Sequence, residues 1–414
     1  MILPFEIISR ILYFINRYPL NNLLYRAAFN GNELFCFYIK ESKNKQINLD
    51  YMLWGATEGG YEHLCQLAKK WGATDFNTML FDAACNGHEH LCYLAKKWGA
   101  NNFNRMLFGA AYSGNERLCQ LAIEWGASNF DEMLQGAAEF GHEQLCRLAK
   151  EYGAIDFDSM LSSASRRGHE HLCRLAKNWG AINFNDMIYW AAWGEYEHLC
   201  YLAKEWGADN FNRMLLKASQ AGNKNLCQLA KKWGANDFEG MLNWATYNGH
   251  EHICRLAKKW GATNFNKMLE IAAECGYINI CCLAKEWGAT NFNGMLIKAA
   301  QSNHKQLCCL AKKWGATNFN EMLYWATLGE DEQLCRLAKN WGATDFNMML
   351  SYAAQRENER LCYLAKEWGA TNFNEMLYWA VRGGHEHLCC LAKEWGATKF
   401  DAFMLSCKKL GSYY

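Results

Sequence analysis

Cysteine and histidine are the residues of this chain whose type and spacing could do chemistry. The 414-residue sequence holds 20 Cys and 12 His, and six His–Cys pairs are four residues apart, as His88 and Cys92 are. Residues four apart share one face of a helix, where an imidazole and a thiolate can chelate a metal ion. Twenty cysteines could also form a disulfide scaffold. The choice between these chemistries depends on the elements that carry the residues.

Tryptophan shows that those elements repeat. Twelve Trp residues between Trp71 and Trp395 are spaced by 27 residues or, across Tyr152, by twice 27, and thirteen Cys residues keep the same step from Cys65 to Cys389. Residues 44–394 therefore divide into thirteen units of 27 residues. An array of repeats replaces the two or three domains that the length alone would indicate.

The repeating unit predicts two helices. With Trp as position 1 it reads W-G-A-T-x-F-N-x-M-L-x-x-A-A-x-x-G-H-E-H-L-C-x-L-A-K-x, and residues 71–97 are a good copy. Positions 9, 10, 13 and 14 form the buried stripe of a first helix, and positions 21, 22, 24 and 25 form that of a second. Gly at position 17 is predicted to end the first helix in a left-handed conformation. Asn or Asp at position 7 is predicted as its N-cap, as in Asn77, Asn104, Asp131 and Asp158.

Such a unit predicts an all-α fold. Two short helices cannot bury their own apolar faces, so neighbouring units must bury them in an α-solenoid of about thirteen helix-turn-helix repeats. The only 2 Pro residues lie in the first 20 residues, which agrees with continuous helices afterwards. We predict a capping helix or F-box-like segment at 1–19, a degenerate first repeat at 20–43, thirteen repeats at 44–394 and a C-terminal capping half-repeat at 395–414.

The repeats change the interpretation of Cys and His. Thirteen Cys fall at position 22, on the apolar face of the second helix. Equivalent residues of stacked units lie about 9–10 Å apart, beyond the roughly 7 Å between Cα atoms that a disulfide spans. We therefore expect reduced, buried thiols and a reducing compartment. The His residues at positions 18 and 20 are expected to begin the second helix, and no C-x-x-C completes a zinc site, so no metal or cofactor is expected.

Enzymatic activity is not expected. Paired carboxylates, a nucleophile with a base and a phosphate-binding glycine loop are all missing as unique constellations, since the glycines recur at helix ends in every unit. Lys and Arg number 43 against 42 Asp and Glu, for a net charge of +1. This balance argues against a surface built to neutralise the phosphates of a nucleic acid.

The unit resembles the ankyrin repeat. Residues 78–100 read x-M-L-x-x-A-A-x-x-G-H-E-H-L-C-x-L-A-K-x-W-G-A, and the ankyrin unit reads T-P-L-H-x-A-A-x-x-G-H, an apolar helix and G-A-D. About six residues of the ankyrin unit are missing here and F-N replaces T-P, so its β-turn fingers are expected to be shortened or absent. Arrays of short units with tryptophan also resemble those of large DNA viruses. The resemblance implies a protein-binding role, with the first helices lining the concave side.

The N-terminal segment has two open interpretations. It resembles the opening of an F-box, L-P-x-E-I-x-x-x-I-L, which would dock on an adaptor of a cullin-type ubiquitin ligase. Alternatively, it is an amphipathic capping helix on the first repeat. No secretory signal and no run of 18 apolar residues occurs, so no membrane segment is expected. The residues that match the F-box are Leu3, Pro4, Glu6, Ile7, Ile11 and Leu12.

Residues that differ between units point to a binding surface. Positions 8, 11, 12 and 15 share the face of the first helix opposite its buried stripe. Large aromatic residues recur there among Lys, Arg and Glu, a mixture typical of interface hot spots. Packing against the neighbouring unit is the alternative, and the same ring can do both. The predicted partner-binding residues are Phe108, Tyr112, Tyr189, Trp190, Trp193, Trp244, Tyr247, Tyr324, Trp325, Tyr352, Tyr378 and Trp379.

These patterns predict a cytoplasmic protein-interaction scaffold that binds a partner protein in a concave, aromatic-lined groove. For a viral protein, the compartment would be the host cytoplasm. One alternative is a substrate receptor of a ubiquitin ligase, which would dock through the F-box-like segment. Another is a structural subunit of a larger, viral assembly. Acidic residues on the aromatic face argue further against nucleic acid as the partner.

Overall fold

The computed structural model describes residues 20–41 and 47–398, which form 28 helices and no strand. The chain divides into two compact units, Met1–Lys217 and Ala218–Tyr414, with the boundary inside helix α16 (Phe211–Ala221). The described residues before and after this boundary are called here the N-terminal unit and the C-terminal unit. The predicted all-α array of helix pairs is confirmed.

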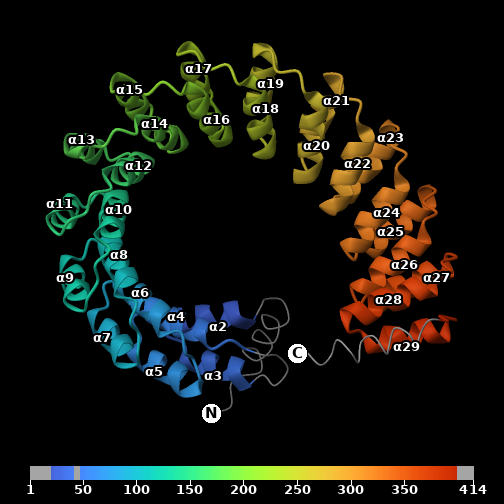
Figure 1. Ribbon diagram of the computed structural model, residues 1–414, viewed down its shortest axis with the longest axis horizontal. Coiled ribbons are helices and arrows are strands. Elements are labelled where there is room, and N and C mark those ends of the chain that lie inside the picture. Colours follow the sequence, from blue (N-terminus) through green and yellow to red (C-terminus); the bar gives the residue numbers. More distant parts are fainter. Residues whose placement is uncertain (1–19, 42–46, 399–414) are drawn as a thin grey trace. The chain divides into compact units, whose positions relative to one another are not determined.

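Each repeat contributes a first helix with an even number and a second helix with an odd number (Figure 1). The first helices are α2 (Leu20–Phe29), α4 (Asp50–Glu58), α6 (Phe76–Cys85), α8 (Phe103–Ser113), α10 (Phe130–Phe140), α12 (Phe157–Arg167), α14 (Phe184–Trp193), α16, α18 (Phe238–Tyr247), α20 (Phe265–Cys275), α22 (Phe292–Gln301), α24 (Phe319–Leu328), α26 (Phe346–Gln355) and α28 (Phe373–Gly383). The second helices are α3 (Glu33–Glu41), α5 (Glu62–Trp71), α7 (Glu89–Lys97), α9 (Glu116–Glu124), α11 (Glu143–Glu151), α13 (Glu170–Trp179), α15 (Glu197–Glu205), α17 (Lys224–Lys232), α19 (Glu251–Trp260), α21 (Ile278–Glu286), α23 (Lys305–Trp314), α25 (Glu332–Trp341), α27 (Glu359–Glu367) and α29 (Glu386–Glu394).

The predicted apolar stripes form the core. In α6, Met79 and Ala83 have no exposed surface, and in α7 the same holds for Leu91 and Cys92. Packing between neighbouring repeats runs mainly through the first helices, as α6 on α8 and α8 on α10. The link from α5 to α6 is residues 72–75, which leaves no room for the longer finger of an ankyrin unit.

The predicted N-cap of the first helix is wrong by two residues. The side chain at position 5 is the cap: Asn102 accepts a hydrogen bond from the backbone N–H of Arg105 at the start of α8. Position 7 lies inside the helix, where its side chain is free to reach the next repeat. The Oδ1 atom of Asn77 accepts the backbone N–H groups of Asn101 and Asn102 at 2.9 and 3.0 Å.

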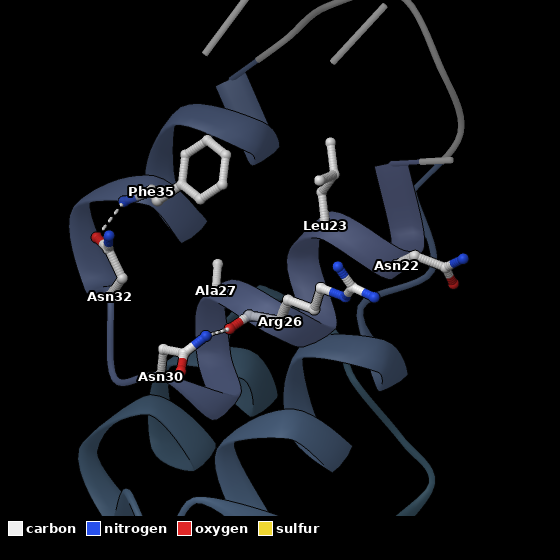
Figure 2. Close-up of a pocket in the computed structure, with 7 residues that line it drawn as sticks. All are labelled: Asn22, Leu23, Arg26, Ala27, Asn30, Asn32 and Phe35. Carbon is white, nitrogen blue, oxygen red and sulfur yellow. Dashed lines mark hydrogen bonds between the residues drawn. The ribbon is translucent and has the colours of Figure 1, made fainter. Parts of the chain in front are cut away.

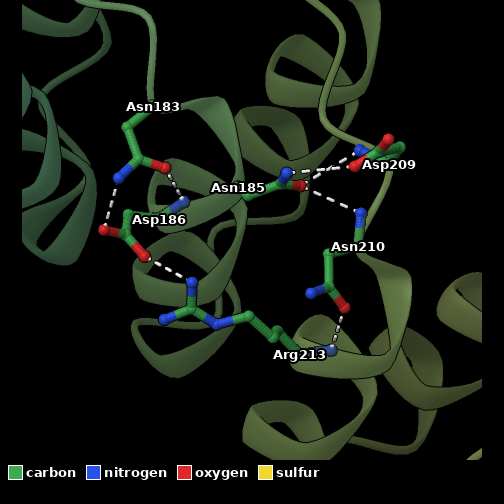
Figure 3. A network of polar contacts seen from close by, with 6 residues as sticks. All are labelled: Asn183, Asn185, Asp186, Asp209, Asn210 and Arg213. Carbon is green, nitrogen blue, oxygen red and sulfur yellow. Dashed lines mark hydrogen bonds and ion pairs between the residues drawn. The ribbon is translucent and has the colours of Figure 1, made fainter.

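Position 7 therefore links successive repeats along one edge of the array. Figure 3 shows this link between α14 and α16, where Asn185 accepts the N–H groups of Asp209 and Asn210 at 3.0 and 2.9 Å. Beside it, Arg213 and Asp186 form an ion pair of 2.6 Å. These backbone N–H groups lie in the loop before a helix, where no carbonyl group of the helix can accept their hydrogen bonds. The Asn or Asp side chain satisfies them from the preceding repeat.

Tryptophan at position 1 closes most of the second helices. The Trp98 ring packs edge-on against Phe76 with ring centroids 5.4 Å apart, and Nζ of Lys69 lies 4.5 Å from its centroid. The same Lys–Trp–Phe stack recurs in most described repeats, and cation–π contacts of this kind stabilise by about 0.5–1 kcal/mol at exposed sites. Where Tyr152 replaces Trp, Ile123 replaces the Lys 29 residues earlier. The repeat that lacks tryptophan, the ring that binds cations best, therefore also lacks the cation.

Glycine at position 17 ends the first helix as predicted. Gly114 has a φ of +75° and caps α8. Four repeats adopt the same left-handed conformation without glycine, which is strained for side chains other than Asn. These residues are Glu195, Asn303, Glu330 and Glu357, with φ between +55° and +64°.

Candidate partner-binding surface

The first helices line the inner side of the curve in each unit, and the second helices line the outer side (Figure 1). The buried stripe of each first helix faces its second helix and its neighbours. The opposite face, which carries positions 8, 11, 12 and 15, therefore points to the inner side. All twelve predicted partner-binding residues lie on first helices.

In the N-terminal unit the inner rings from α6 to α14 form two groups. Phe81 and Phe108 stack with centroids 6.4 Å apart, and the Tyr112 ring lies 3.9 Å from that of Phe140. Phe140 was missed by the sequence prediction, because it stands at position 16 and contacts Tyr112 of the preceding repeat. The second group is on α14, where the Trp190 centroid lies 5.0 Å from Tyr189 and 6.3 Å from Trp193.

In the C-terminal unit the inner rings also group. Tyr324, Tyr352 and Trp379 form a row across three repeats, with centroid distances of 4.9 and 6.4 Å. Tyr324 also touches Trp325, and Tyr378 touches Trp379. Trp244 and Tyr247 pair on α18 at 6.3 Å. Contacts between repeats thus hold part of this aromatic surface in place.

Exposure divides the twelve predicted residues into two sets. Seven are half-buried: Phe108, Tyr189, Trp190, Tyr324, Trp325, Tyr352 and Trp379. Five are exposed, with 39–57% of their surface open: Tyr112, Trp193, Trp244, Tyr247 and Tyr378. Sequence alone cannot make this division, because it depends on which residue the neighbouring repeat places beside each ring. The first set packs, and the second set presents apolar surface to solvent.

Cations on the inner side stack on these rings. The guanidinium of Arg105 lies 4.7 Å from the Phe81 centroid, and that of Arg382 lies 5.5 Å from Trp379. Tyr189 is approached by both Arg213 and Lys217 at 4.7 Å. A carboxylate neutralises one of these cations, since Asp186 pairs with Arg213. The inner surface is therefore dominated by aromatic side chains and is only weakly charged.

Two acidic side chains, Asp82 and Glu58, interact in the N-terminal unit. Burial, followed by the charge of Glu58, raises the pKa of Asp82 to about 7, although Arg105 lowers it. The Tyr25 hydroxyl donates to Glu58 at 2.5 Å, and burial with this contact raises the pKa of Tyr25 to about 12. One proton can therefore be gained or lost here near neutral pH.

The repeated cysteines are buried as predicted. Those at position 22 are at most 4% exposed, and burial raises the pKa of Cys92 and Cys119 to about 12, so both are neutral thiols. In five repeats a Ser or Thr at position 14 touches this thiol, as Thr246 touches Cys254 at 3.5 Å. Among the described residues, no group of three or more His, Cys, Asp or Glu could hold a metal ion.

Histidine at position 18 begins the second helix as predicted, and it also binds the preceding repeat. Nε2 of His142 lies 3.2 Å from the carbonyl oxygen of Tyr112, and since a carbonyl only accepts, the imidazole donates. The ring covers Gly114, where a Cβ atom would lie 2.6 Å from it. The same bond is made by His88, His169, His250, His304 and His385.

The first described repeat has a cavity beside α2 and the start of α3. Its volume is about 310 Å³, and Figure 2 shows Leu23, Ala27 and Phe35 among the residues that line it. They stand at positions 9, 13 and 21, which are fully buried in later repeats such as α6 and α7. The adaptor-docking residues predicted between Leu3 and Leu12 lie outside the described residues, so both interpretations of that segment stay predictions.

Comparisons with known proteins do not assign the chain to a family. No protein-family model matches the chain, and no curated protein matches it. Among solved structures, the chain is similar to one described as a circular tandem repeat protein with novel repeat topology and enhanced subunit contact surfaces, at 17% sequence identity over 98% of each chain and a TM-score of 0.16. That TM-score gives no common arrangement of the helices, so the fold rests on the repeats described above. In the part of the chain that the structure describes, no helix combines the length and apolar character needed to cross a bilayer.

Proposed function

We propose that this chain is a protein-interaction scaffold that binds a segment of a partner protein on the inner, aromatic side of its first helices. The observation that carries the proposal is the set of five exposed rings on that side. Trp193 is 44% exposed and Tyr247 is 57% exposed, although neither stands at a position the core uses.

Variation between repeats supports recognition over packing. Every described repeat buries nearly the same Met, Leu and Ala residues whether or not it carries an inner ring. Helix α12 has none, and α20 has an isoleucine at position 12 instead. Exposed aromatic side chains that fold stability does not require are what interface hot spots are made of.

The half-buried rings make this surface rigid before binding. Trp190 is held by Tyr189 on one side and Trp193 on the other. Rings that are already ordered lose little side-chain entropy when a partner arrives, so more of their contact energy appears as affinity. Recognition of this kind requires no chemical step, and the fingerless, ankyrin-like repeat supplies a surface in place of a single deep pocket.

The partner that fits is a protein segment rich in apolar side chains. Several charges on the inner side are paired, as in Lys298 with Glu274 at 3.2 Å, and this favours discrimination by shape and aromatic contact over net charge. A nucleic acid would require cations along the inner side that are left unpaired to meet phosphates. The paired charges favour a protein partner.

The test combines Trp190→Ala, Trp193→Ala and Trp244→Ala in one chain and compares partner capture by affinity purification with mass spectrometry. Each hot-spot truncation costs about 2 kcal/mol or more of binding free energy, so the affinity of the triple variant for its partner should fall by more than about a hundredfold. Circular dichroism should show unchanged helix content.

Matched controls lie on the outer side of the same array. Tyr93 and Tyr363 are 47% and 48% exposed on the second helices α7 and α27. A chain with Tyr93→Ala and Tyr363→Ala should keep its partners. Equal capture by the triple variant and the native chain would overturn the proposed binding surface.

A further inference from the structure

The inner aromatic surface of the N-terminal unit is interrupted at α12. Its positions 11 and 12 are Ser162 and Ser163, where α14 has Tyr189 and Trp190. A cavity of about 100 Å³ lies in this gap, open to the inner side. Its lining comes from three successive first helices: Gln135, Ser159, Ser162, Ser163, Arg166 and Trp190.

The polar groups of this cavity differ in their surroundings: the Ser159 hydroxyl donates to the Asp156 carboxylate at 2.6 Å, whereas Gln135, Ser162 and Ser163 face the cavity. Ser163 is 5% exposed, Ser162 is half-buried and Gln135 is exposed, and the Ser163 hydroxyl is not among the fully buried side-chain atoms that lack a hydrogen-bond partner. A helix serine can satisfy itself by donating to the carbonyl four residues earlier, as Ser165 does to Leu161 at 2.5 Å. Water can reach these groups, and a ligand that reproduces the hydrogen bonds of that water can replace it.

Arg166 is the one charged residue that lines the cavity. Its Nη2 bonds to the carboxylate of Glu139, and Arg167 bonds to the same carboxylate at 3.1 Å, so two cations share one anion. A guanidinium has five N–H groups, which leaves others for a ligand. The Trp190 ring lies 5.5 Å from the Arg166 guanidinium and forms one wall.

Size limits the ligand to one small group. A water molecule takes about 30 Å³ of liquid volume, so a cavity of about 100 Å³ holds roughly three waters. Sites for whole small molecules are usually about 300–1,000 Å³. The cavity therefore accepts the end of one side chain.

We propose that the cavity between α10, α12 and α14 binds the anionic end of one side chain of the partner segment, either a carboxylate or a phosphate. Ser162, Ser163, Gln135 and Arg166 supply hydrogen-bond donors, and Trp190 flanks the group. This inference rests on the proposed function, because the side chain arrives as part of a segment bound along the inner side. It adds an anchor point to a surface that is otherwise aromatic.

The test uses four degenerate peptide libraries that differ only in a fixed central residue: Glu, phosphoserine, Gln or Lys. Binding of each library to the full chain is measured by fluorescence anisotropy. Hydrogen bonds to a charged group contribute about 1.5–3 kcal/mol, so the Glu or the phosphoserine library should bind at least about tenfold more tightly than the Gln library. The stronger of the two identifies carboxylate or phosphate as the natural group.

Two variants and two matched controls locate the effect. Ser163→Val fills the cavity with an apolar side chain, and Arg166→Gln removes its charge, so each should abolish the preference for an anion. Ser351→Val changes a serine that is 3% exposed in α26, and Arg382→Gln changes an arginine that also stacks on a Trp ring at 5.5 Å. Both controls should keep the preference.

The two proposals can fail separately. Equal binding of the Glu, phosphoserine and Gln libraries overturns the anion cavity and leaves the aromatic surface standing, as does a preference that survives Ser163→Val and Arg166→Gln. If no library binds, the aromatic surface fails, and the cavity is judged by titrating the chain with sodium acetate and sodium phosphate. A shift of the Arg166 side-chain NMR signal that Ser163→Val removes then supports the cavity, and no shift overturns it.

Discussion

Position 12 of the first helix is small through most of the N-terminal unit and large throughout the C-terminal unit. In the N-terminal unit it is Gly55, Asp82, Gly109, Gly136 and Ser163 before Trp190 and Lys217. In the C-terminal unit it is Trp244, Ile271, Lys298, Trp325, Tyr352 and Trp379. The buried stripes of the two units are otherwise nearly the same.

This difference changes how first helices meet. A Cβ atom on Gly55 would lie 2.2 Å from the carbonyl oxygen of Tyr25, and one on Gly109 would lie 3.0 Å from that of Phe81. In the N-terminal unit, therefore, helices approach backbone to backbone. In the C-terminal unit, large side chains stand between the helices, as Tyr352 does between Tyr324 and Trp379. One variable position thus sets both the approach of neighbouring helices and the aromatic area of the inner side.

The largest expected effect comes from Gly55→Ala. The added methyl would strike backbone, which cannot turn aside as a side chain can, so we expect a loss of about 3 kcal/mol of stability in the N-terminal unit. Denaturant unfolding followed by hydrogen exchange measures this loss in each unit. Gly329→Ala is the control, because its nearest backbone oxygen would be 3.4 Å away and its φ of −82° suits alanine. Similar stability of the two variants would contradict the close approach of α2 and α4.

A smaller effect on stability is expected when a change of pH titrates Asp82, the acidic residue at position 12. Its pKa is about 7 in the folded chain and about 4 when unfolded, so the folded state holds an extra proton between these values. Stability contributed by that proton is present at low pH and is lost as the pH rises through 7. Between pH 6 and 8 the N-terminal unit should lose about 1 kcal/mol.

The groups that face Asp82 are Glu58, Asp75 and Arg105, and Tyr25 bonds to Glu58. Asp82→Asn should remove the loss while leaving these groups in place. The measurement is the denaturant midpoint of the N-terminal unit at pH 5, 6, 7 and 8. Parallel pH curves for the variant and the native chain would show that Asp82 does not titrate as described.

The smallest expected effect is a gain from Glu330→Gly. Glu330 has a φ of +55°, and three of the four residues other than glycine at position 17 lie in the C-terminal unit. Glycine adopts this conformation without a steric cost, so thermal unfolding should show a gain of roughly 0.5–1 kcal/mol in that unit. Asn303→Gly should gain less, because asparagine tolerates the left-handed region. Destabilisation by Glu330→Gly would mean that its side chain makes contacts worth more than the strain.

Sequence reasoning was most accurate where the repeats agree. The 27-residue period predicted the helix pairs, the left-handed Gly114 and the burial of Cys92, because each follows from local propensity and one repeated contact. It was wrong about position 7, since Asn is an equally good cap at either of two nearby positions. Only the loop of the next repeat shows that Asn77 is used to bind Asn101 and Asn102.

The candidate site was less predictable. Its rings could be assigned to one face of the first helices, but Tyr112 is exposed and Tyr324 is half-buried for reasons that lie in neighbouring repeats. The cavity at Ser163 was missed altogether. A signal was present, because Ser162 and Ser163 interrupt aromatic positions, but a serine pair by itself equally describes a solvated helix face.

By itself, the sequence determined the repeat, the two helices of each unit, their core and the buried state of the repeated thiols. Those features depend on residues within one helix pair, whose apolar stripes leave a single way to pack. The stacked structure decided which rings face solvent, how position 7 is used and where Ser163 opens a cavity beside Arg166. These depend on residues some 24–30 positions apart, and only stacking brings such residues within reach of one another.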